Sequence, residues 1–186
     1  MISIEADEKP DSNWNLRLLN SPHGTIYQTK EIAAYLETVL RSKNIFLKFV
    51  NERGKIVGQL LLSTYSRFDK KGKVGRILKK IPGQKNLIYR WSYGPVIFDS
   101  SVNNEVCAAL HDFLILRNCR VLGYEHPLAG GSLSVLGKPF KIRPWATFLI
   151  DLSLNKEILW KNMDKHAARK NIERSRSRGV YVKEID

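Results

Sequence analysis

Two segments of the chain repeat their apolar residues every three to four positions, which predicts amphipathic helices. The first helix is expected over residues 30–43, with Thr29 as its N-cap. Its apolar face consists of Ile32, Leu36, Val39 and Leu40. The second helix is expected over residues 101–118, where a serine or an asparagine offers the cap. Its repeating face consists of Val106, Leu110, Phe113, Leu114 and Arg117.

Shorter apolar runs, rich in β-branched and aromatic residues, predict strands. Two of them, "NIFLKFV" and "KIVGQLLLSTY", flank a four-residue polar turn that contains Gly54, which is typical of a hairpin. The run "NLIYRWSYGPVIF" predicts a strand that Gly94 and Pro95 interrupt or place at a sheet edge. Short strands are expected at "RVLGYEHP" and "ATFLIDLSL", and the acidic start "MISIEADEKP" reads as a polar lead-in.

The order of these elements predicts an α+β domain, because helices that return between strands pack on a mixed sheet. This domain is expected to close near residue 152. Asn155 then caps a long basic helix that reaches about residue 178, and a strand is expected to open over residues 180–185. The predicted organisation is one domain over residues 1–152 and the entry to a second domain over residues 153–186.

The net charge of +13 and the pI near 9.8 favour negatively charged partners such as RNA. Residues 67–85 carry eight Lys or Arg against one Asp, and residues 156–183 carry nine against three acidic residues. A polyanion site would use the helix from Lys165 to Arg178 and the lysines of the first segment. Those lysines are Lys70, Lys71, Lys73, Lys79 and Lys80. The alternative is that both segments are solvated surface charge.

The sequence contains no phosphate-binding glycine loop, no nucleophile elbow and no paired-histidine zinc motif. The four histidines have no ligand spacing, so we expect neither a metal nor a cofactor. Cys107 and Cys119 lie in or just after an apolar helical pattern and are expected to be buried thiols. The alternative is a nucleophile paired with a base, either Cys107 or Cys119 with His111 or His126.

Neither a signal peptide nor a transmembrane segment is expected. The first ten residues are acidic and poor in apolar residues, and nowhere do 18 apolar residues run together. The default expectation is therefore a cytoplasmic protein.

Three stretches, in the same order along the chain, are similar to the motifs of one family. They are "SPHGTIYQTKEIAAYLE", "IYRWSYGPVIFD" and "TFLIDLSLNKEILWKNMDKHAARKNIERSRSRGVYV". The first fits a pattern S-x-x-G-x-x-x-Q-[ST] that opens a helix, the second a strand with a Gly-Pro pair, and the third a D-L-S segment followed by a basic helix. Together they resemble the Fem-type aminoacyltransferases and their FemAB-like relatives. The resemblance implies two acetyltransferase-like (GNAT) domains in tandem, of which this chain holds the first and the entry to the second.

The resemblance also implies a chemistry and its partners. The family forms a peptide bond, passing an amino acid from an aminoacyl-tRNA to an amine on a peptidoglycan precursor. The implied partners are an aminoacyl-tRNA or another polyanionic substrate, and a second chain or a further C-terminal domain. Because the family's catalytic lysine and donor-binding residues lie in its second domain, this chain alone is expected to show little or no transfer.

Two groups of residues are placed at the substrates by the resemblance. Tyr93, Gly94 and Pro95 would face the acceptor cleft, with the Tyr93 hydroxyl offered to a substrate group. Arg169, Lys170 and Arg174 would hold a phosphate or a carboxylate. The alternatives are a strand-edge aromatic that packs on its neighbours and a helix face that is merely solvated.

One departure from the family pattern lies in the first helix. Where substrate-binding members carry a tryptophan and a lysine, this chain has Ile32 and Leu36, so a phosphate-gripping lysine is replaced by an expected core leucine. This departure argues against a nucleotide-linked acceptor. Two hypotheses follow: a Fem-like acyl or aminoacyl transferase in incomplete or shortened form, or a non-catalytic basic GNAT-like module that binds RNA or another polyanion.

Overall fold

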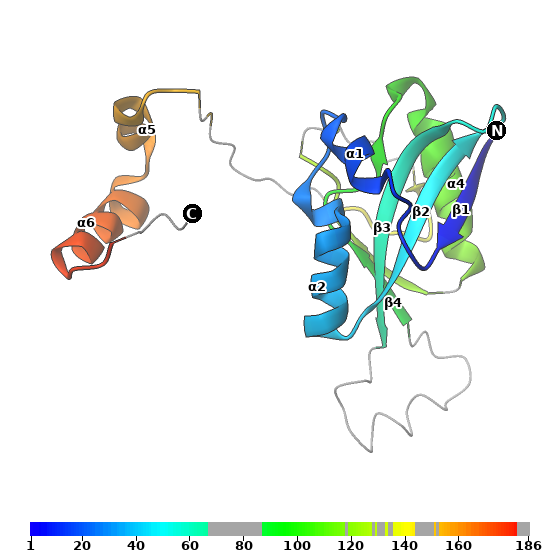
Figure 1. The fold of residues 1–186 in the computed structure, drawn as a ribbon, viewed down its shortest axis with the longest axis horizontal. Coiled ribbons are helices and arrows are strands. Elements are labelled where there is room, and N and C mark those ends of the chain that lie inside the picture. Colours follow the sequence, from blue (N-terminus) through cyan, green and yellow to red (C-terminus); the bar gives the residue numbers. More distant parts are fainter. Residues whose placement is uncertain are drawn as a thin grey trace, which may run out of the picture. The chain divides into compact units, whose positions relative to one another are not determined.

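The computed structural model describes residues 1–66, 87–117, 119–127, 129, 133, 136–143, 151 and 153–181. The chain divides into two compact units, Met1–Trp145 and Ala146–Asp186 (Figure 1). The domain boundary that the sequence predicts, after residue 152, lies inside the second unit. The basic segment of residues 67–85 and most of the strand expected at "ATFLIDLSL" lie outside the described residues.

A mixed sheet forms the centre of the first unit. Within the described residues its strand order is β1-β2-β3-β4-β6, and β5 pairs with β3. The strands are β1 (Ile2–Asp7), β2 (Lys43–Asn51), β3 (Ile56–Ser66), β4 (Leu87–Trp91), β5 (Val96–Ile97) and β6 (Arg120–Gly123). β4 and β6 pair in parallel, whereas the other pairs are antiparallel. The predicted α+β class with a mixed sheet is confirmed.

The predicted hairpin is formed by β2 and β3, and one asparagine organises its turn. Asn51 Oδ1 accepts hydrogen bonds from the backbone N–H groups of Arg53 and Lys55, both at 3.0 Å. Gly54 has a φ of 72°, in the left-handed region that glycine adopts without a steric penalty. The polar turn that the sequence predicts therefore has a specific geometry, which fixes the register of the two longest strands.

Helices cover both faces of the sheet (Figure 1). α1 (Trp14–Leu19) and α2 (Lys30–Leu40) pack on one face, and α4 (Asn103–Leu116) packs on the other. The expected cap of α2 is present, because Thr29 Oγ1 accepts a hydrogen bond from Ile32 N at 3.3 Å. A 3-10 turn, η3 (Ser100–Val102), leads into α4. The two helices that the sequence predicts within this unit are confirmed.

Alternate residues of the central strands belong to two separate cores, because successive side chains of a strand point to opposite faces of the sheet. Leu47 and Phe49 of β2 belong to the core under α4, whereas Phe46 belongs to the core under α1 and α2. α4 contributes five buried residues: Val106, Cys107, Leu110, Phe113 and Leu114. The core under α1 and α2 is smaller and consists of Trp14, Leu18, Ala33, Phe46, Leu61 and Val96.

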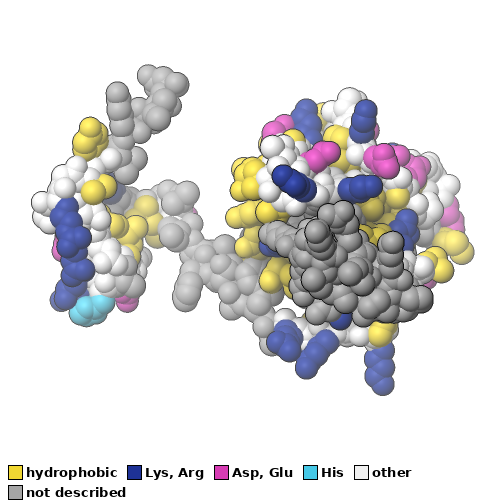
Figure 2. Space-filling model, turned by 90° about the horizontal axis from the view of Figure 1, so that it is seen from below, with side chains coloured by type: hydrophobic (Ala, Val, Ile, Leu, Met, Phe, Trp, Pro, Cys, Tyr) yellow, Lys and Arg dark blue, Asp and Glu magenta, His cyan; other side chains and the backbone are white. Residues whose placement is uncertain are grey.

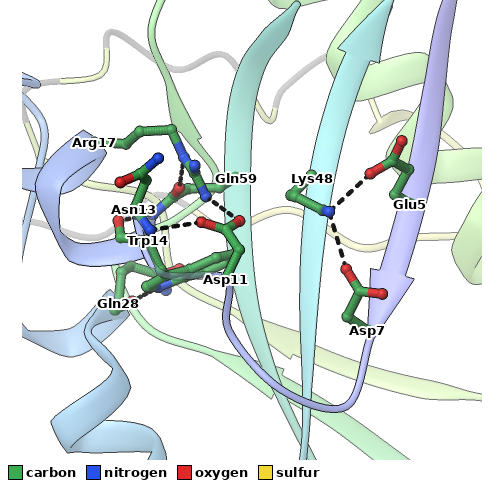
Figure 3. Close-up of polar contacts among 9 residues, drawn as sticks. All are labelled: Glu5, Asp7, Asp11, Asn13, Trp14, Arg17, Gln28, Lys48 and Gln59. Carbon is green, nitrogen blue, oxygen red and sulfur yellow. Dashed lines mark hydrogen bonds and ion pairs between the residues drawn. The ribbon is translucent and has the colours of Figure 1, made fainter. Parts of the chain in front are cut away.

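The expectation of a polar lead-in is wrong, because the first residues form the edge strand β1. Ile2 and Ile4 pack against the core under α4. The acidic residues of β1 serve the neighbouring strand: Lys48 Nζ lies 2.8 Å from a Glu5 oxygen and 3.0 Å from an Asp7 oxygen (Figure 3). These two ion pairs raise the pKa of Lys48. The alternation of Ile2 and Ile4 with polar residues is the signal of a half-buried strand.

α1, which the sequence analysis also missed, is held to the sheet by a polar network (Figure 3). Arg17 donates from Nη2 to Asp11 Oδ2 at 2.6 Å and from Nε to Gln59 Oε1 at 2.8 Å. Gln59 is fully buried and donates from Nε2 to the carbonyl oxygen of Trp14 at 3.1 Å. The Arg17 guanidinium lowers the pKa of Asp11. The network satisfies every polar group of the buried glutamine side chain.

The second unit contains three helical segments: α5 (Lys156–Asn162), η5 (Lys165–Arg169, a π-helix) and α6 (Lys170–Ser177). The predicted cap is present, since Asn155 Oδ1 accepts from Ile158 N at 2.9 Å. The single long helix that we expected is interrupted, however. Met163 is extended, with a ψ of 142°, and Asp164 Oδ1 then accepts from His166 N at 2.9 Å. A new cap therefore restarts the helix after Met163.

Most of the strand expected over residues 180–185 lies outside the described residues. In the part of the chain that the structure describes, none of the helices has the length and apolar character that crossing a membrane requires.

Candidate functional site

The parallel strands β4 and β6 lead into two short segments that lie beside each other. Tyr124 N donates to the carbonyl oxygen of Trp91 at 3.3 Å, and Gly94 N donates to the carbonyl oxygen of Tyr124 at 3.0 Å. α4 forms the connection between the two strands (Figure 1). In sheets built this way, ligands commonly bind beyond the carboxyl ends of the parallel strands. The side chains that follow β4 and β6 are therefore candidates for a site.

Four rings gather there, which we call the Tyr–His cluster: His23, Tyr27, Tyr93 and His126. The ring centroids lie 5.0 Å apart for Tyr27 and Tyr93, 6.1 Å for Tyr93 and His126, and 5.5 Å for His23 and His126. Two of the rings follow β4 and β6. The other two come from the connection between α1 and α2, which includes the 3-10 turn η1 (Ile26–Gln28). Tyr27 is 47% exposed, so the cluster is accessible from solvent on that side.

Tyr93 carries its ring into the cluster through an uncommon backbone conformation. Its φ is 52°, in the left-handed region, where a side chain costs roughly 1–2 kcal/mol. Backbone strain of this kind is concentrated at functional sites. Gly94 and Pro95 are buried, and a Cβ at Gly94 would lie 2.6 Å from Leu60 Cδ1. Of the three residues that the sequence places at an acceptor cleft, Tyr93 is partly exposed, and the other two form its support.

A buried amide fixes the segment that carries Tyr93. Gln28 Nε2 donates to the carbonyl oxygen of Ser92 at 2.7 Å, and Gln28 Oε1 accepts from Leu61 N at 2.7 Å. The backbone carbonyl of Gln28 accepts from Trp14 Nε1, also at 2.7 Å (Figure 3). This glutamine belongs to the S-x-x-G-x-x-x-Q pattern. Its role in this chain is structural, because it joins β3, the end of β4 and α1.

His126 is the titratable group on which the chemistry of the cluster depends. Burial lowers the pKa of His126, and the nearby positive form of His23 lowers it further. A histidine with a lowered pKa is neutral at pH 7 and can accept a proton. The cluster therefore combines a neutral imidazole with two tyrosine hydroxyls at one accessible end of the sheet.

A groove of about 280 Å³ lies between α2 and strands β3 and β4. We call it the α2 groove. The residues that line it are Tyr27, Ile32, Tyr35, Leu36, Leu40, Ser42, Leu61, Ser63, Tyr65, Arg90, Trp91 and Ser92. Figure 2 shows hydrophobic side chains on the side of the first unit where Figure 1 places α2. Tyr27 belongs to both the groove and the Tyr–His cluster, so the two features adjoin.

The groove corrects the expectation that Leu36 is a core residue. Leu36 is only partly buried and, with Ile32, it lines the wall of the groove. The two positions at which the resembled family carries a tryptophan and a lysine therefore lie, in this chain, on the surface of the groove and not in the interior of the domain.

Two polar groups of the groove are notable. The Oγ of Ser42 is buried and has no hydrogen-bond partner among the described residues, although buried hydroxyls usually have one. Arg90 is exposed and is the one charged residue among the described residues that line the groove. A polar ligand in the groove would meet an unused hydroxyl and a cation.

The second group of predicted site residues lies in the second unit. Arg169 is partly buried within η5, and Lys170 and Arg174 are exposed on α6. Figure 2 shows Lys and Arg side chains in a row on this unit. The five lysines of the predicted polyanion site, Lys70, Lys71, Lys73, Lys79 and Lys80, lie outside the described residues.

The cysteine alternative does not fit the structure. Cys107 is completely buried in the core under α4, where no substrate carbonyl could reach its thiol. Both ring nitrogens of His111 lie at hydrogen-bond distance from other groups, Nδ1 from Asp112 Oδ1 (3.1 Å) and Nε2 from the Lys138 carbonyl oxygen (3.0 Å). Across the described ranges, no group of three or more His, Cys, Asp or Glu residues is arranged to hold a metal ion.

Sequence reasoning named His126 only as a possible base for a cysteine and did not bring it together with His23, Tyr27 and Tyr93, because the cluster joins three segments that are distant along the chain. Comparison with protein-family models, with curated proteins and with solved structures found no match to this chain.

Proposed function

We propose that the first unit is the acceptor-binding half of an acyl or aminoacyl transferase with a GNAT-like fold. The observation that carries this proposal is the Tyr–His cluster, which lies at the carboxyl ends of the parallel strands β4 and β6 and adjoins the α2 groove. The mixed sheet with helices on both faces is compatible with that fold. The resemblance to Fem-type aminoacyltransferases points to the same chemistry.

The cluster suits transfer of an acyl group to an amine. The neutral amine attacks the carbonyl carbon of an ester, the new C–N bond forms, and the ester C–O bond breaks. The proton that the amine loses passes to His126 and then to the leaving hydroxyl oxygen. The lowered pKa of His126 keeps its imidazole unprotonated for the first of these steps. Tyr93 and Tyr27 would orient the amine through their hydroxyls.

This chemistry needs no covalent nucleophile, which agrees with the burial of Cys107 and the low exposure of Cys119. The donor, an aminoacyl-tRNA in the family that the chain resembles, would be held by groups of a second domain or second chain. We therefore expect no turnover of an aminoacyl-tRNA by the 186-residue chain alone.

An activated ester reacts without a dedicated donor site, so it tests the proposed acceptor-binding half of the transferase by itself. The 186-residue chain is incubated with 4-nitrophenyl acetate and a set of primary amines, and amide products are measured by mass spectrometry. We expect amide formation about 10²-fold above buffer, the lower range of general-base catalysis. His126→Gln should remove this acceleration, whereas His166→Gln, at an exposed position of the second unit, should keep it. Equal rates for the chain, for His126→Gln and for buffer would refute the proposal.

The exposed charge of the second unit favours a second candidate function, binding of RNA or another polyanion without catalysis. Lys170, Arg174, Arg176 and Arg178 are exposed on or directly after α6. Cations that contact phosphates release counterions, so the affinity for tRNA should fall with salt at a log–log slope of roughly 0.7–0.9 for each phosphate contacted. Replacing Arg174 and Arg178 by alanine should reduce this slope, and Arg53→Ala, in the hairpin turn, should not. An unchanged slope in the double variant would exclude this binding mode.

A further inference from the structure

One wall of the α2 groove is α2 itself, which buries unusually few of its residues. Of the eleven residues of α2, Ala33 is the one that is buried. Apolar side chains along the helix stay open to solvent: Tyr35 is 55% exposed, Val39 55% and Leu40 43%. An amphipathic helix normally buries such side chains against the sheet beneath it. Here the helix lies over the sheet without closing on it at this end, and the groove is the space that remains.

The opposite wall is formed by alternate residues of β3, namely Leu61, Ser63 and Tyr65. Leu61 is almost fully buried, whereas the neighbouring Trp91 of β4 belongs to the core under α4. The position of the wall is fixed by Gln28, whose side chain bonds to Leu61 N and to the carbonyl oxygen of Ser92. A groove of about 280 Å³ is near the lower limit of the cavities that bind small molecules, which start at roughly 300 Å³. It suits one compact apolar body rather than an extended chain.

The polar groups of the groove restrict what this body carries. The Oγ of Ser42 is buried and has no hydrogen-bond partner among the described residues, and the residue as a whole is only 4% exposed. A buried hydroxyl without a partner is costly. A ligand oxygen or nitrogen at Ser42 would supply the missing hydrogen bond. Arg90 offers a single positive charge, and no described carboxylate forms an ion pair with it. One cation balances one carboxylate or one sulfonate, but it would leave most of the charge of a diphosphate without a partner.

We infer that the α2 groove binds a small acidic molecule with an apolar, aromatic-sized body, its single anionic group near Arg90 and its body between α2 and the wall of Leu61 and Tyr65. The identity of this molecule as the amine acceptor rests on the proposed function, since Tyr27 joins the groove to the Tyr–His cluster. The binding itself does not depend on that function.

The probe is 8-anilinonaphthalene-1-sulfonate, which combines an aromatic body with one sulfonate and fluoresces when it leaves water. We expect one site per chain in a fluorescence titration. Leu36→Glu and Leu40→Glu place a negative charge in the wall, which repels the sulfonate and makes the wall polar, and should weaken binding about tenfold or more. Leu116→Glu changes an exposed leucine on α4 (83% exposed) and should leave the affinity within about twofold. Circular dichroism verifies that each variant is folded. Equal affinities for all three variants and the unmodified chain would overturn the inference.

Displacement of the probe tests the chemical class. 4-Phenylbutyrate should displace it about tenfold better than 4-phenylbutanol, because one ion pair with Arg90 in a partly desolvated groove contributes about that much. This advantage should disappear in Arg90→Gln and persist in Arg53→Gln. Uridine diphosphate should displace the probe poorly. Better displacement by uridine diphosphate, or an acid advantage that survives Arg90→Gln, would contradict the inference.

The two proposals fail separately. The amide-forming assay depends on His126 and an acyl donor, whereas probe binding depends on Leu36 and requires no reaction. Probe binding at the groove without amide formation would remove the transferase proposal alone. Amide formation that Leu36→Glu leaves unchanged, together with absent probe binding, would remove the groove as the acceptor site and leave the role of His126 intact.

Discussion

The two faces of the sheet are covered to very different extents. On one face, α4 buries five of its residues in a core that includes Leu47, Phe49 and Trp91. On the other face, α2 buries Ala33 alone, and its larger apolar side chains border a groove. Both helices are amphipathic and both were predicted from the same kind of periodicity. Periodicity therefore identifies which face of a helix is apolar, but not whether that face is closed.

The difference has an energetic consequence. Each Å² of apolar surface removed from water stabilises the fold by about 25 cal/mol, so the face under α4 contributes more to folding than the face under α2. Apolar surface that stays exposed on α2 remains available to a ligand, which would gain the same free energy on binding. We infer that the face under α4 mainly stabilises the first unit and that the face under α2 is the one available to a ligand. The following predictions test this contrast, from the largest expected effect to the smallest.

Truncation of matched leucines on the two helices should separate the faces most clearly. Leu110 is completely buried under α4, and Leu110→Ala should reduce the free energy of unfolding by about 2–5 kcal/mol. Leu40 is 43% exposed on α2, and Leu40→Ala should cost less than about 1 kcal/mol. Urea denaturation followed by circular dichroism gives both values. Similar losses for the two variants would mean that α2 is as closely packed as α4.

Removal of the buried amide that supports the open face should have the next largest effect. Gln28→Met keeps the volume of the side chain and removes the bonds to Leu61 N and to the carbonyl oxygen of Ser92. A buried N–H and a partly buried carbonyl of the backbone lose their partners, so we expect a loss of about 2–3 kcal/mol in the free energy of unfolding.

The matched control for this variant is Asn15→Ala. It removes two exposed hydrogen bonds, the donation from Nδ2 to Glu31 and the acceptance by Oδ1 from Lys30 N, and should reduce the stability by about 1 kcal/mol or less. If Gln28→Met is as stable as the control, water must replace both bonds, and the wall of the groove is less rigid than described.

The pH dependence of stability should show the smallest effect, with opposite signs on the two sides. Burial and His23 lower the pKa of His126, so the unfolded chain binds a proton at a higher pH than the folded chain does. Its contribution is complete above the unfolded value near 6.5 and is lost as the pH falls through the lowered pKa. His111, on α4, has a raised pKa because of the Lys138 carbonyl and Asp112. Its contribution is complete below about 6.5 and is lost as the pH rises through the raised pKa.

Urea denaturation between about pH 5 and pH 8 measures both contributions. His126→Gln should reduce the loss of stability on the acid side, and His111→Gln should reduce the loss on the neutral side. A change in the same direction for both variants would show that the two histidines are not in the environments described.

The local signals in the sequence were sufficient for much of the fold. The hairpin of β2 and β3, α2 with its Thr29 cap, and α4 depend on contacts between near neighbours, and periodicity and cap chemistry report these directly. β1 was missed because its polar residues are acidic and its two isoleucines are too few to outweigh them. Their role becomes visible only beside Lys48 of the adjacent strand.

The site was less accessible to sequence reasoning. Tyr93 was identified through the resemblance, but His23 and His126 come from segments that only the parallel pairing of β4 and β6 and the position of the α1–α2 connection bring together. Gln28 was part of a quoted motif, yet its spacing could not reveal that its amide bonds to two strands. Gly24 of the same motif has a comparable explanation, because a Cβ there would lie 1.9 Å from the carbonyl oxygen of Leu18. The contacts of these residues depend on the pairing of segments that are far apart in the sequence, so no local pattern predicts them.

The placement of the two cysteines makes the rate of thiol labelling a measure of how often one face of the sheet opens. Cys107 is completely buried and Cys119 is 8% exposed, and both belong to the core under α4. A thiol reagent can reach them only when that core opens, so the rate of labelling under native conditions reports the opening free energy of the α4 face. α2 can separate from the sheet without exposing either thiol. The rate of thiol labelling therefore reports the opening of the α4 face, and the rate of amide hydrogen exchange in α2 reports the opening of the other face. Slower labelling than exchange would show that the two faces open separately, in one molecule and without any substitution.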